Sequence, residues 1–145
     1  MTEIDGTTGS STRNRALSSR YYEAWNSGDL AIPDEIFAET FFINDPGSPV
    51  PLVMGPNGVK GRIRDYRAAF PDLEIEVEDV VGEGDRVATR WTLRGTHLGV
   101  FAGFEATGRR IEVPGITIHR ADGGLIVEAW VNWDTLGMRR QLQGE

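Results

Sequence analysis

The sequence predicts an α+β fold, in which helices pack on one face of a bent, mostly antiparallel sheet. Up to Phe70 the apolar residues recur at helical spacing, whereas after Leu73 they alternate with polar residues at a period of two. Helices first and strands afterwards is the chain order of an α+β protein. Because such a sheet curls round one layer of helices, we expect a cone with a concave interior.

The first structured element is expected to be a helix that begins at residue 13. Residues 1–12 are polar and rich in Gly, Ser and Thr, so we expect a flexible leader that cannot bury enough apolar surface to offset its ordering entropy. A single domain then covers 13–145, because a chain of 145 residues has the size of one domain. The sequence Asn-Ser-Gly at 26–28 ends the helix. The apolar residues at helical spacing are Leu17, Tyr21, Tyr22 and Trp25.

A short helix and a short strand are expected next. The helix covers 29–37 and carries Pro33 near its first turn, where the missing N–H costs little. Residues 41–43 predict a brief strand, which the turn sequence at 44–47 closes. Segment 50–54 is apolar but contains a proline, so we expect a loop or a sheet edge there.

The third helix is expected to open at the Gly-Pro-Asn-Gly sequence of 55–58. It ends at Phe70, because Pro71 pushes the residue before it out of the helical region. Apolar residues spaced i, i+4 and i+7 form its buried face, and its basic residues would lie on the exposed face.

Four strands and a closing helix are expected in the second half. The strands cover the segments 73–81, 86–97, 109–120 and 125–133. The Ala-Asp-Gly-Gly sequence at 121–124 predicts a hairpin between the last two. A helix at 134–142 follows, with Asp134 or Thr135 as its N-cap.

The composition excludes several classes of function. With 22 acidic and 15 basic side chains, the net charge of -7 argues against binding to nucleic acid. There is no apolar run of the roughly 20 residues that cross a bilayer, and no signal peptide pattern, so we expect a cytoplasmic protein without membrane contact. The absence of cysteine removes disulfides and thiolate chemistry. His97 and His119 are the only histidines, too few for a convincing metal site.

Several short stretches resemble the SnoaL-like polyketide cyclases, within the wider family shaped like nuclear transport factor two. The matching stretches are 22–29, 44–49, 69–72, 90–91, 95–101, 106–110, 128–130, 134 and 141–142. The resemblance implies an α+β barrel around a deep apolar cavity, with no metal and no bound cofactor. It also implies a homodimer formed by packing of sheet on sheet.

The family includes aldol cyclases, hydroxylases of anthracycline-type polyketides, and proteins that only bind ligands. The resemblance places the acid/base aspartate of the cyclases at Val131, which has no proton to exchange, and Asn44 and Ala129 stand where many relatives carry histidine. The favoured hypothesis is therefore cofactor-independent hydroxylation of an aromatic polyketide ring, with a reductase as a further partner. An aldol cyclase with another acid/base residue and a non-catalytic binding protein for a hydrophobic polycyclic molecule are the alternatives.

Three residues are candidates for catalysis. His119, on a central strand, titrates near neutrality and could remove a phenolic or enolic proton, or it could be a buried histidine with a hydrogen-bonded neighbour. Arg90 would orient a substrate oxygen or else pair with Glu128, because a charge between apolar residues needs a partner. Asp134 is either the acid/base of a cyclase or only a helix N-cap. Alternation along the last strand puts Asp134 and Val131 on opposite faces.

A further set of residues is expected to contact a flat, multi-ring substrate, because aromatic side chains stack on such rings. These candidates are Tyr21, Trp25, Asn44, Arg62, Phe70, Phe101, Phe104, Thr117, Val131 and Trp133. Packing in the core is the alternative for the aromatic members, and a solvated helix face is the alternative for Arg62. His97 is expected to stabilise a turn near the mouth of the cavity.

Overall fold

The computed structural model describes residues 2–46, 52 and 55–145. Its elements in chain order are α1 (Thr2–Ser27), α2 (Ile32–Ile36), β1 (Phe37–Asn44), α3 (Gly55–Ala69), β2 (Glu74–Glu83), β3 (Arg86–Thr96), β4 (Arg110–Asp122), β5 (Leu125–Trp133) and α4 (Thr135–Gln143). The predicted α+β class is confirmed, with three helices before the run of long strands.

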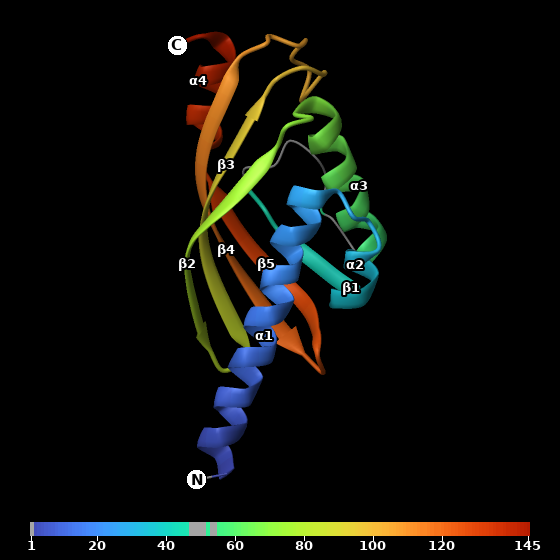
Figure 1. Ribbon diagram of the computed structural model, residues 1–145, viewed down its shortest axis with the longest axis vertical. Coiled ribbons are helices and arrows are strands. Elements are labelled where there is room, and N and C mark those ends of the chain that lie inside the picture. The colour runs from blue at the N-terminus through green and yellow to red at the C-terminus, as the bar shows by residue number, and fades with distance from the viewer. Residues whose placement is uncertain (1, 47–51, 53–54) are drawn as a thin grey trace.

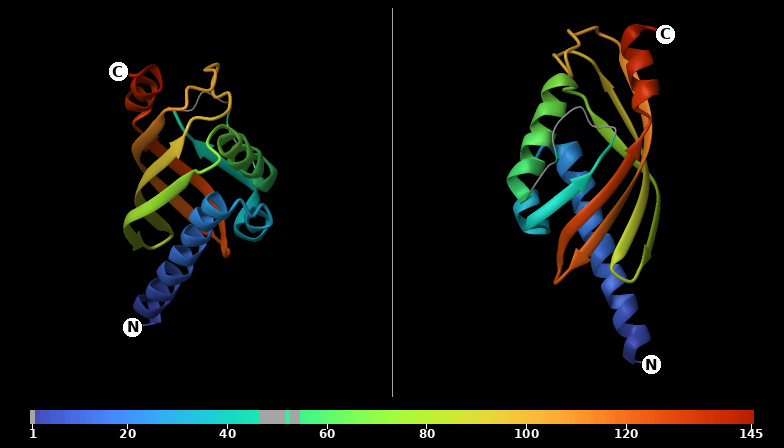
Figure 2. Two further views of the ribbon diagram at one scale, coloured as in Figure 1. Left: turned by 45° about the horizontal axis from the view of Figure 1, so that its top comes forward. Right: turned by 180° about the vertical axis from the view of Figure 1, so that it is seen from behind.

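One curved, open sheet carries the fold, and helices α1, α2 and α3 cover one of its faces (Figure 1). The five strands follow the order β1-β5-β4-β3-β2, with β1 parallel to β5 and the other neighbours antiparallel. Figure 2 shows from two further sides how α1 and α3 lie on the same side of this sheet. The sheet therefore forms one wall of an interior whose opposite wall is helical.

Turn chemistry sets the register of the last two strands. Gly123 and Gly124 have φ of +61° and +83°, the left-handed pair that a tight hairpin turn requires. Inward residues then alternate with outward ones along β4, where Val113, Gly115 and Thr117 are buried. The buried apolar side chains of helices and strands form one cluster.

Two elements differ in length from the prediction. Helix α1 begins at Thr2 and so includes most of the segment 1–12; Figure 1 shows this end extending beyond the sheet. Propagation of an existing helix adds one hydrogen bond for each residue fixed, so a helix can continue into a segment of weak propensity. Strand β1 begins at Phe37 instead of residue 41, because it pairs with β5. Of the segment 50–54, only Leu52 lies within the described residues.

The ends of the helices follow local chemistry, as the sequence predicts. Gly28, with φ of +75°, follows the last residue of α1. Helix α3 ends at Ala69, directly before Phe70. In α4, Asp134 is the N-cap, and its side chain accepts a hydrogen bond from the backbone N–H of Gly137. Among the described residues, no helix combines the length and the hydrophobicity needed to span a bilayer.

Candidate functional site

A small cavity lies between the sheet and the helices α1 and α3. The described residues that line it are mostly aromatic or aliphatic: Tyr21, Tyr22, Trp25, Ile43, Arg62, Tyr66, Ile75, Trp91, Leu93, Thr117, Val131 and Trp133. Its volume is about 40 Å³. Since one water molecule needs about 10–15 Å³, the cavity holds about three. It is therefore much smaller than the multi-ring substrate expected from the sequence.

Trp91 is one reason for the small volume. A Cβ atom at Gly115, on the neighbouring strand, would meet the Trp91 ring at 2.4 Å, so the indole lies directly over the glycine. The indole N–H donates to the Thr117 hydroxyl at 2.9 Å. The absence of a side chain at 115 thus lets a large ring cover the sheet, and its hydrogen bond holds it there.

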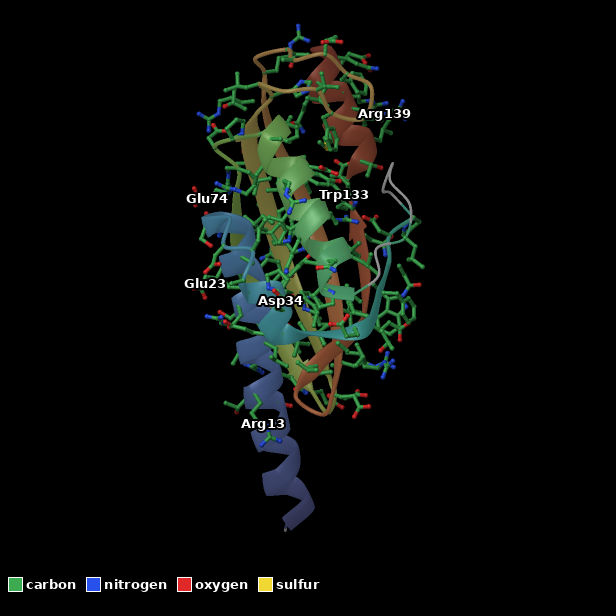
Figure 3. The ribbon with its side chains drawn as sticks, turned by 90° about the vertical axis from the view of Figure 1, so that its right-hand side faces the viewer. Arg13, Glu23, Asp34, Glu74, Trp133 and Arg139 are labelled. Atoms are coloured by element: carbon green, nitrogen blue, oxygen red, sulfur yellow. The ribbon has the colours of Figure 1, made fainter. Side chains whose placement is uncertain are left out.

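An ion pair stands at the edge of this aromatic cavity. Arg62 of α3 and Asp45, directly after β1, pair through Nη2 and Oδ2, and their side chains are only 9% and 3% exposed. Trp133, labelled in Figure 3, donates its indole N–H to the other Asp45 oxygen at 3.1 Å. Asp45 therefore holds two lining residues, one from the helix and one from the sheet. The solvated position considered for Arg62 is wrong, because residue 62 shares the inner face of α3 with Val59, Ile63 and Tyr66.

Three residues that line the cavity, Arg62, Tyr66 and Tyr22, have a buried donor without a hydrogen-bond partner among the described residues, and the first two lie next to each other on α3. Within the described part of the chain, neither Arg62 Nη1 nor the Tyr66 hydroxyl has a hydrogen-bond partner. The Arg62 guanidinium carbon lies 5.7 Å from the centre of the Tyr66 ring. Leaving a buried donor unpaired costs about 1–3 kcal/mol, so each such group in a native protein calls for an explanation. An oxygen atom of a ligand is the kind of acceptor that each of these donors lacks.

The protonation states of these side chains suit donation. Burial raises the pKa of Tyr66 to about 12, so its hydroxyl keeps its proton at neutral pH. For Arg62, burial works to lower the pKa, but the nearby oxygens of Tyr66, Tyr21 and Asp45 raise it above its usual value. The cavity therefore presents a cation and a neutral hydroxyl to a ligand.

His119 does not reach the cavity, which corrects its predicted role as a base. The ring is 2% exposed and is not among the described residues that line the cavity. Its Nδ1 lies 2.8 Å from the Ser18 hydroxyl of α1, and Tyr21 packs edge-on against it at 4.9 Å. Burial lowers the pKa of His119 to about 3, so the imidazole is neutral. The structure shows the alternative interpretation, a buried histidine with a hydrogen-bonded neighbour.

Arg90 also lies away from the cavity, so the prediction that it orients a substrate is wrong. Its neighbours Thr89 and Trp91 point inward, and strand alternation therefore turns Arg90 to the outer face. There it is 54% exposed and pairs with Asp79, with Nη2 2.6 Å from Oδ2. The pair expected with Glu128 is formed by Arg120 instead, at 3.1 Å.

Asp134 is exposed and caps α4, accepting the Gly137 N–H at 2.8 Å. Val131 lines the cavity, so the predicted separation of these two residues onto opposite faces is confirmed. The structure gives Asp134 no position from which to act on a guest of the cavity.

The remaining candidates divide into two groups. Five of them line the cavity with Arg62, namely Tyr21, Trp25, Thr117, Val131 and Trp133. Asn44 instead donates to the Ala129 carbonyl at 3.0 Å, and Phe70 is a fully buried core residue. Phe101 and Phe104 form a tight turn and pair through two backbone hydrogen bonds. His97 is buried and holds the same loop, because its Nδ1 lies 3.0 Å from the Thr107 hydroxyl.

Asp45, Tyr66 and Trp91 also belong to the site, although the sequence did not predict them there. Asp45 stands before Pro46 in a sequence typical of a turn, which hides its role as a buried counterion. Tyr66 fits the apolar stripe of α3, so its position indicated only a core residue. One feature of the sequence could have indicated the site. Arg62 and Tyr66 are four residues apart, so they lie on the same face of the helix, and Arg62 therefore places a cation on its buried face.

A cone of helices and curved sheet around an internal cavity defines a class of α+β proteins that enclose small molecules. The chain belongs to the SnoaL-like polyketide cyclase family, whose model matches residues 15–142. Among curated protein sequences, nothing matches the chain.

Several solved structures are similar to the chain. IdmH from Streptomyces antibioticus, a candidate polyketide cyclase, is 35% identical, with a TM-score of 0.78 over 90% of this chain and 98% of its own. AclR from Streptomyces galilaeus, a candidate hydroxylase, is 28% identical, with a TM-score of 0.79 over 93% of this chain and 83% of its own. A SnoaL-like protein from Jannaschia sp. CCS1, 23% identical, shares the fold with a TM-score of 0.83, covering 93% of this chain and 94% of its own. The SnoaL-like fold expected from the sequence is thereby confirmed.

Proposed function

We propose that this protein is a polyketide cyclase that closes a carbon ring by intramolecular aldol addition without a cofactor. The observation that carries the proposal is the pair of unpartnered donors, Arg62 Nη1 and the Tyr66 hydroxyl, at the wall of an apolar cavity. The membership in the polyketide cyclase family and the likeness to IdmH support the same reaction class.

The chemistry of ring closure fits these donors. An active methylene between two carbonyl groups loses a proton, and the resulting enolate carbon attacks a second carbonyl carbon of the same molecule. A C–C bond forms, the C=O π bond breaks, and the oxygen that receives the electron pair becomes an alkoxide. Arg62 and Tyr66 would donate to this oxygen as its charge develops, which stabilises the transition state.

The base in this proposal is a water molecule within the cavity. The described residues that line the cavity include no carboxylate and no imidazole. A methylene flanked by two carbonyl groups is acidic enough to lose its proton without a strong base, so the donors to the developing alkoxide supply much of the catalysis. Water would take this proton and return one to the alkoxide, so that protons balance over the reaction.

Asp45 and Trp133 are positioning residues in this scheme. Asp45 accepts a hydrogen bond from Nη2 of Arg62, which leaves Nη1 as the nitrogen that can donate to the ligand. Trp133 fixes the carboxylate from the sheet side. Donors held in place before the substrate binds need no reorganisation during the reaction.

The test uses the purified protein and the N-acetylcysteamine thioester of a linear triketo acid, with and without oxygen. We expect a cyclised product of the same mass, or lighter by one water, under both atmospheres. Removing a donor from an oxyanion site costs about 10²–10³ in kcat, so Arg62→Met and Tyr66→Phe should each lose that much. Arg64→Met, at an exposed position of the same helix, is the matched control and should keep its activity. Product formation that is unaffected in both cavity variants would contradict the proposal.

Hydroxylation of an aromatic polyketide ring is the second candidate, and the likeness to AclR favours it. Insertion of one oxygen atom from O₂ into a C–H bond needs two electrons and two protons, and the second oxygen leaves as water. A reductase partner would supply the electrons. A product heavier by one oxygen atom, formed from an anthraquinone only in air and with a reductant, would establish this reaction instead. Binding of either substrate without turnover would indicate a binding protein.

A homodimer through the outer face of the sheet is proposed as the assembly. Val81, Ala88, Ile118 and Trp130 form one row across four strands on this face, and Val81 is 65% exposed. Burial of such a row supplies hydrophobic stabilisation. Sedimentation of the wild type and of Ile118→Glu would test it: the wild type should sediment as a dimer and the variant as a monomer.

A further inference from the structure

A second hollow lies next to the cavity, between α3 and the loop that follows β3. This outer groove has a volume of about 330 Å³. The described residues that line it are Arg62, Asp65, Tyr66, Ala68, Val100, Phe101 and Ala102. Arg62 and Tyr66 therefore line both hollows, and each of them carries one of the unpartnered donors.

We propose that the outer groove binds the apolar chain of an elongated β-keto substrate, while its reacting carbonyl group lies at Arg62 and Tyr66. This inference rests on the proposed function and names its substrate class. The substrate is then an open-chain molecule with a polar head and an uncharged hydrocarbon tail, instead of a preformed planar multi-ring system.

The first argument is size. The inner cavity, at about 40 Å³, has room for a carbonyl group and its neighbours but for no ring system. Small-molecule sites usually have about 300–1,000 Å³, which is the range of the outer groove. A substrate of ordinary size that reaches the unpartnered donors must therefore leave most of its atoms outside the inner cavity.

The second argument is the chemistry of the groove walls. Val100 and Phe101 offer apolar surface on the loop side, and Val100 is 63% exposed. Ala68 on α3 adds a small apolar side chain. Asp45 already neutralises the charge of Arg62, and the carboxylate of Asp65 adds a negative charge to the groove. The groove therefore disfavours a substrate with an anionic tail. Burying a methylene group on such surface strengthens binding about fourfold.

The third argument is that the loop wall is fixed in place. The N–H groups of Leu98 and Gly99 both donate to the Ala69 carbonyl, at 2.9 and 3.1 Å. A Cβ atom at Gly99 would meet the Ala68 carbonyl oxygen at 2.5 Å, so only glycine allows this close approach. The Phe101 ring then packs against Tyr66 at 4.9 Å. The loop wall of the groove is therefore in direct contact with Tyr66, one of the two proposed donors.

The test compares two probes, the acetoacetyl and the β-ketodecanoyl thioesters of N-acetylcysteamine, by calorimetry with the full chain. We expect the wild type to bind the longer probe about tenfold more tightly or better, because several methylene groups become buried. Ala68→Trp fills the groove and should reduce this preference to about twofold or less. Arg64→Trp adds the same ring at an exposed position of α3 outside the groove, and should keep the preference.

A second variant tests the groove independently, in case Ala68→Trp does not fold. Val100→Asp alters a side chain that is 63% exposed, so the fold should tolerate it, and the preference for the longer probe should again fall. Equal affinities of the wild type for both probes, no binding of the longer probe, or a preference retained in both groove variants would overturn the inference.

The outcomes separate this inference from the proposed function. If the wild type closes no ring but shows a chain-length preference that both groove variants lose, the groove stands and the cyclase proposal fails. If ring closure depends on Arg62 while the chain length has no effect on affinity, the cyclase proposal stands and the groove inference is wrong.

Discussion

Two buried polar pairs join helices to the rest of the fold, and they differ in what they leave unsatisfied. Ser18 and His119 connect α1 to β4 through a hydrogen bond of 2.8 Å between neutral groups. Arg62 and Asp45 connect α3 to the end of β1 through an ion pair, but one Arg62 nitrogen has no partner within the described residues. The first pair lies outside the cavity lining, whereas Arg62 belongs to it.

The difference shows how a fold separates stability from binding. A neutral pair whose partner is present needs nothing further, so its burial only fixes the helix. A charged pair that leaves one donor unpaired next to a cavity destabilises the free protein. A ligand oxygen that accepts from this donor would remove that destabilisation. Burial alone therefore does not mark a functional residue, and an unsatisfied donor beside a cavity is the better sign.

The largest effect is expected at the charged pair. Asp45→Ala should lower the free energy of unfolding by about 3–5 kcal/mol, because it leaves the buried Arg62 charge without its counterion. Urea denaturation measures the loss. The double variant Asp45→Ala/Arg62→Met should recover much of it, since the charge is then gone. A loss below about 1 kcal/mol in the single variant would remove the contrast between the two pairs.

The neutral pair should respond to pH. The unfolded chain binds a proton at His119 near pH 6.5, whereas the folded protein resists it until about pH 3. Stability is therefore highest above pH 6.5 and falls as the pH decreases toward 3. Between pH 7 and 5 we expect a loss of about 2 kcal/mol. His119→Gln keeps a polar group for Ser18 but does not titrate, so a pH dependence as steep as that of the wild type would contradict this account.

A smaller effect is expected at Asp134, which is satisfied and exposed. Replacing an N-cap costs about 1 kcal/mol, so Asp134→Ala should lower the free energy of unfolding by that amount and leave ring closure unchanged. Denaturation and the thioester assay together check both parts. A tenfold fall in kcat would return Asp134 to the catalytic role that the sequence suggested.

The smallest effect is expected at Arg90 on the outer face. An exposed ion pair contributes about 0–1 kcal/mol, so Arg90→Ala should change stability by no more than that. Ligand affinity should match the wild type, and calorimetry with the β-ketodecanoyl probe measures it. A marked loss of affinity would mean that the outer face and the cavity are coupled.

Local chemistry made most of the fold predictable from the sequence. Pro71 fixed the end of α3, the glycines at 123–124 fixed the last hairpin, and alternation fixed which side chains share a face. Alternation also contained a signal against Arg90, because Val87, Thr89, Trp91 and Leu93 form the buried row of β3.

The site itself depends on contacts between distant parts of the chain. Asp45 and Arg62 come from a strand end and a helix, and nothing in their local sequence shows that they meet. For His119 the inward face was predicted correctly, but the position of α1 along the sheet was not, and Tyr21 of that helix packs against the imidazole. Periodicity gives the face of an element, whereas the level at which a helix crosses the sheet is set by the packing of whole elements.

The contact of Trp91 with Gly115 has a consequence for how this scaffold can change its guests. The indole ring of Trp91 limits the volume of the cavity. Trp91 lies directly opposite Gly115 on the paired strand, and the ring packs against that glycine. A smaller residue at 91 would widen the chamber while leaving the strand pairing untouched, and any β-carbon at 115 would push the indole further inward. Substitutions at positions 91 and 115 alone would therefore change the size of the ligand that fits, without a change in the backbone.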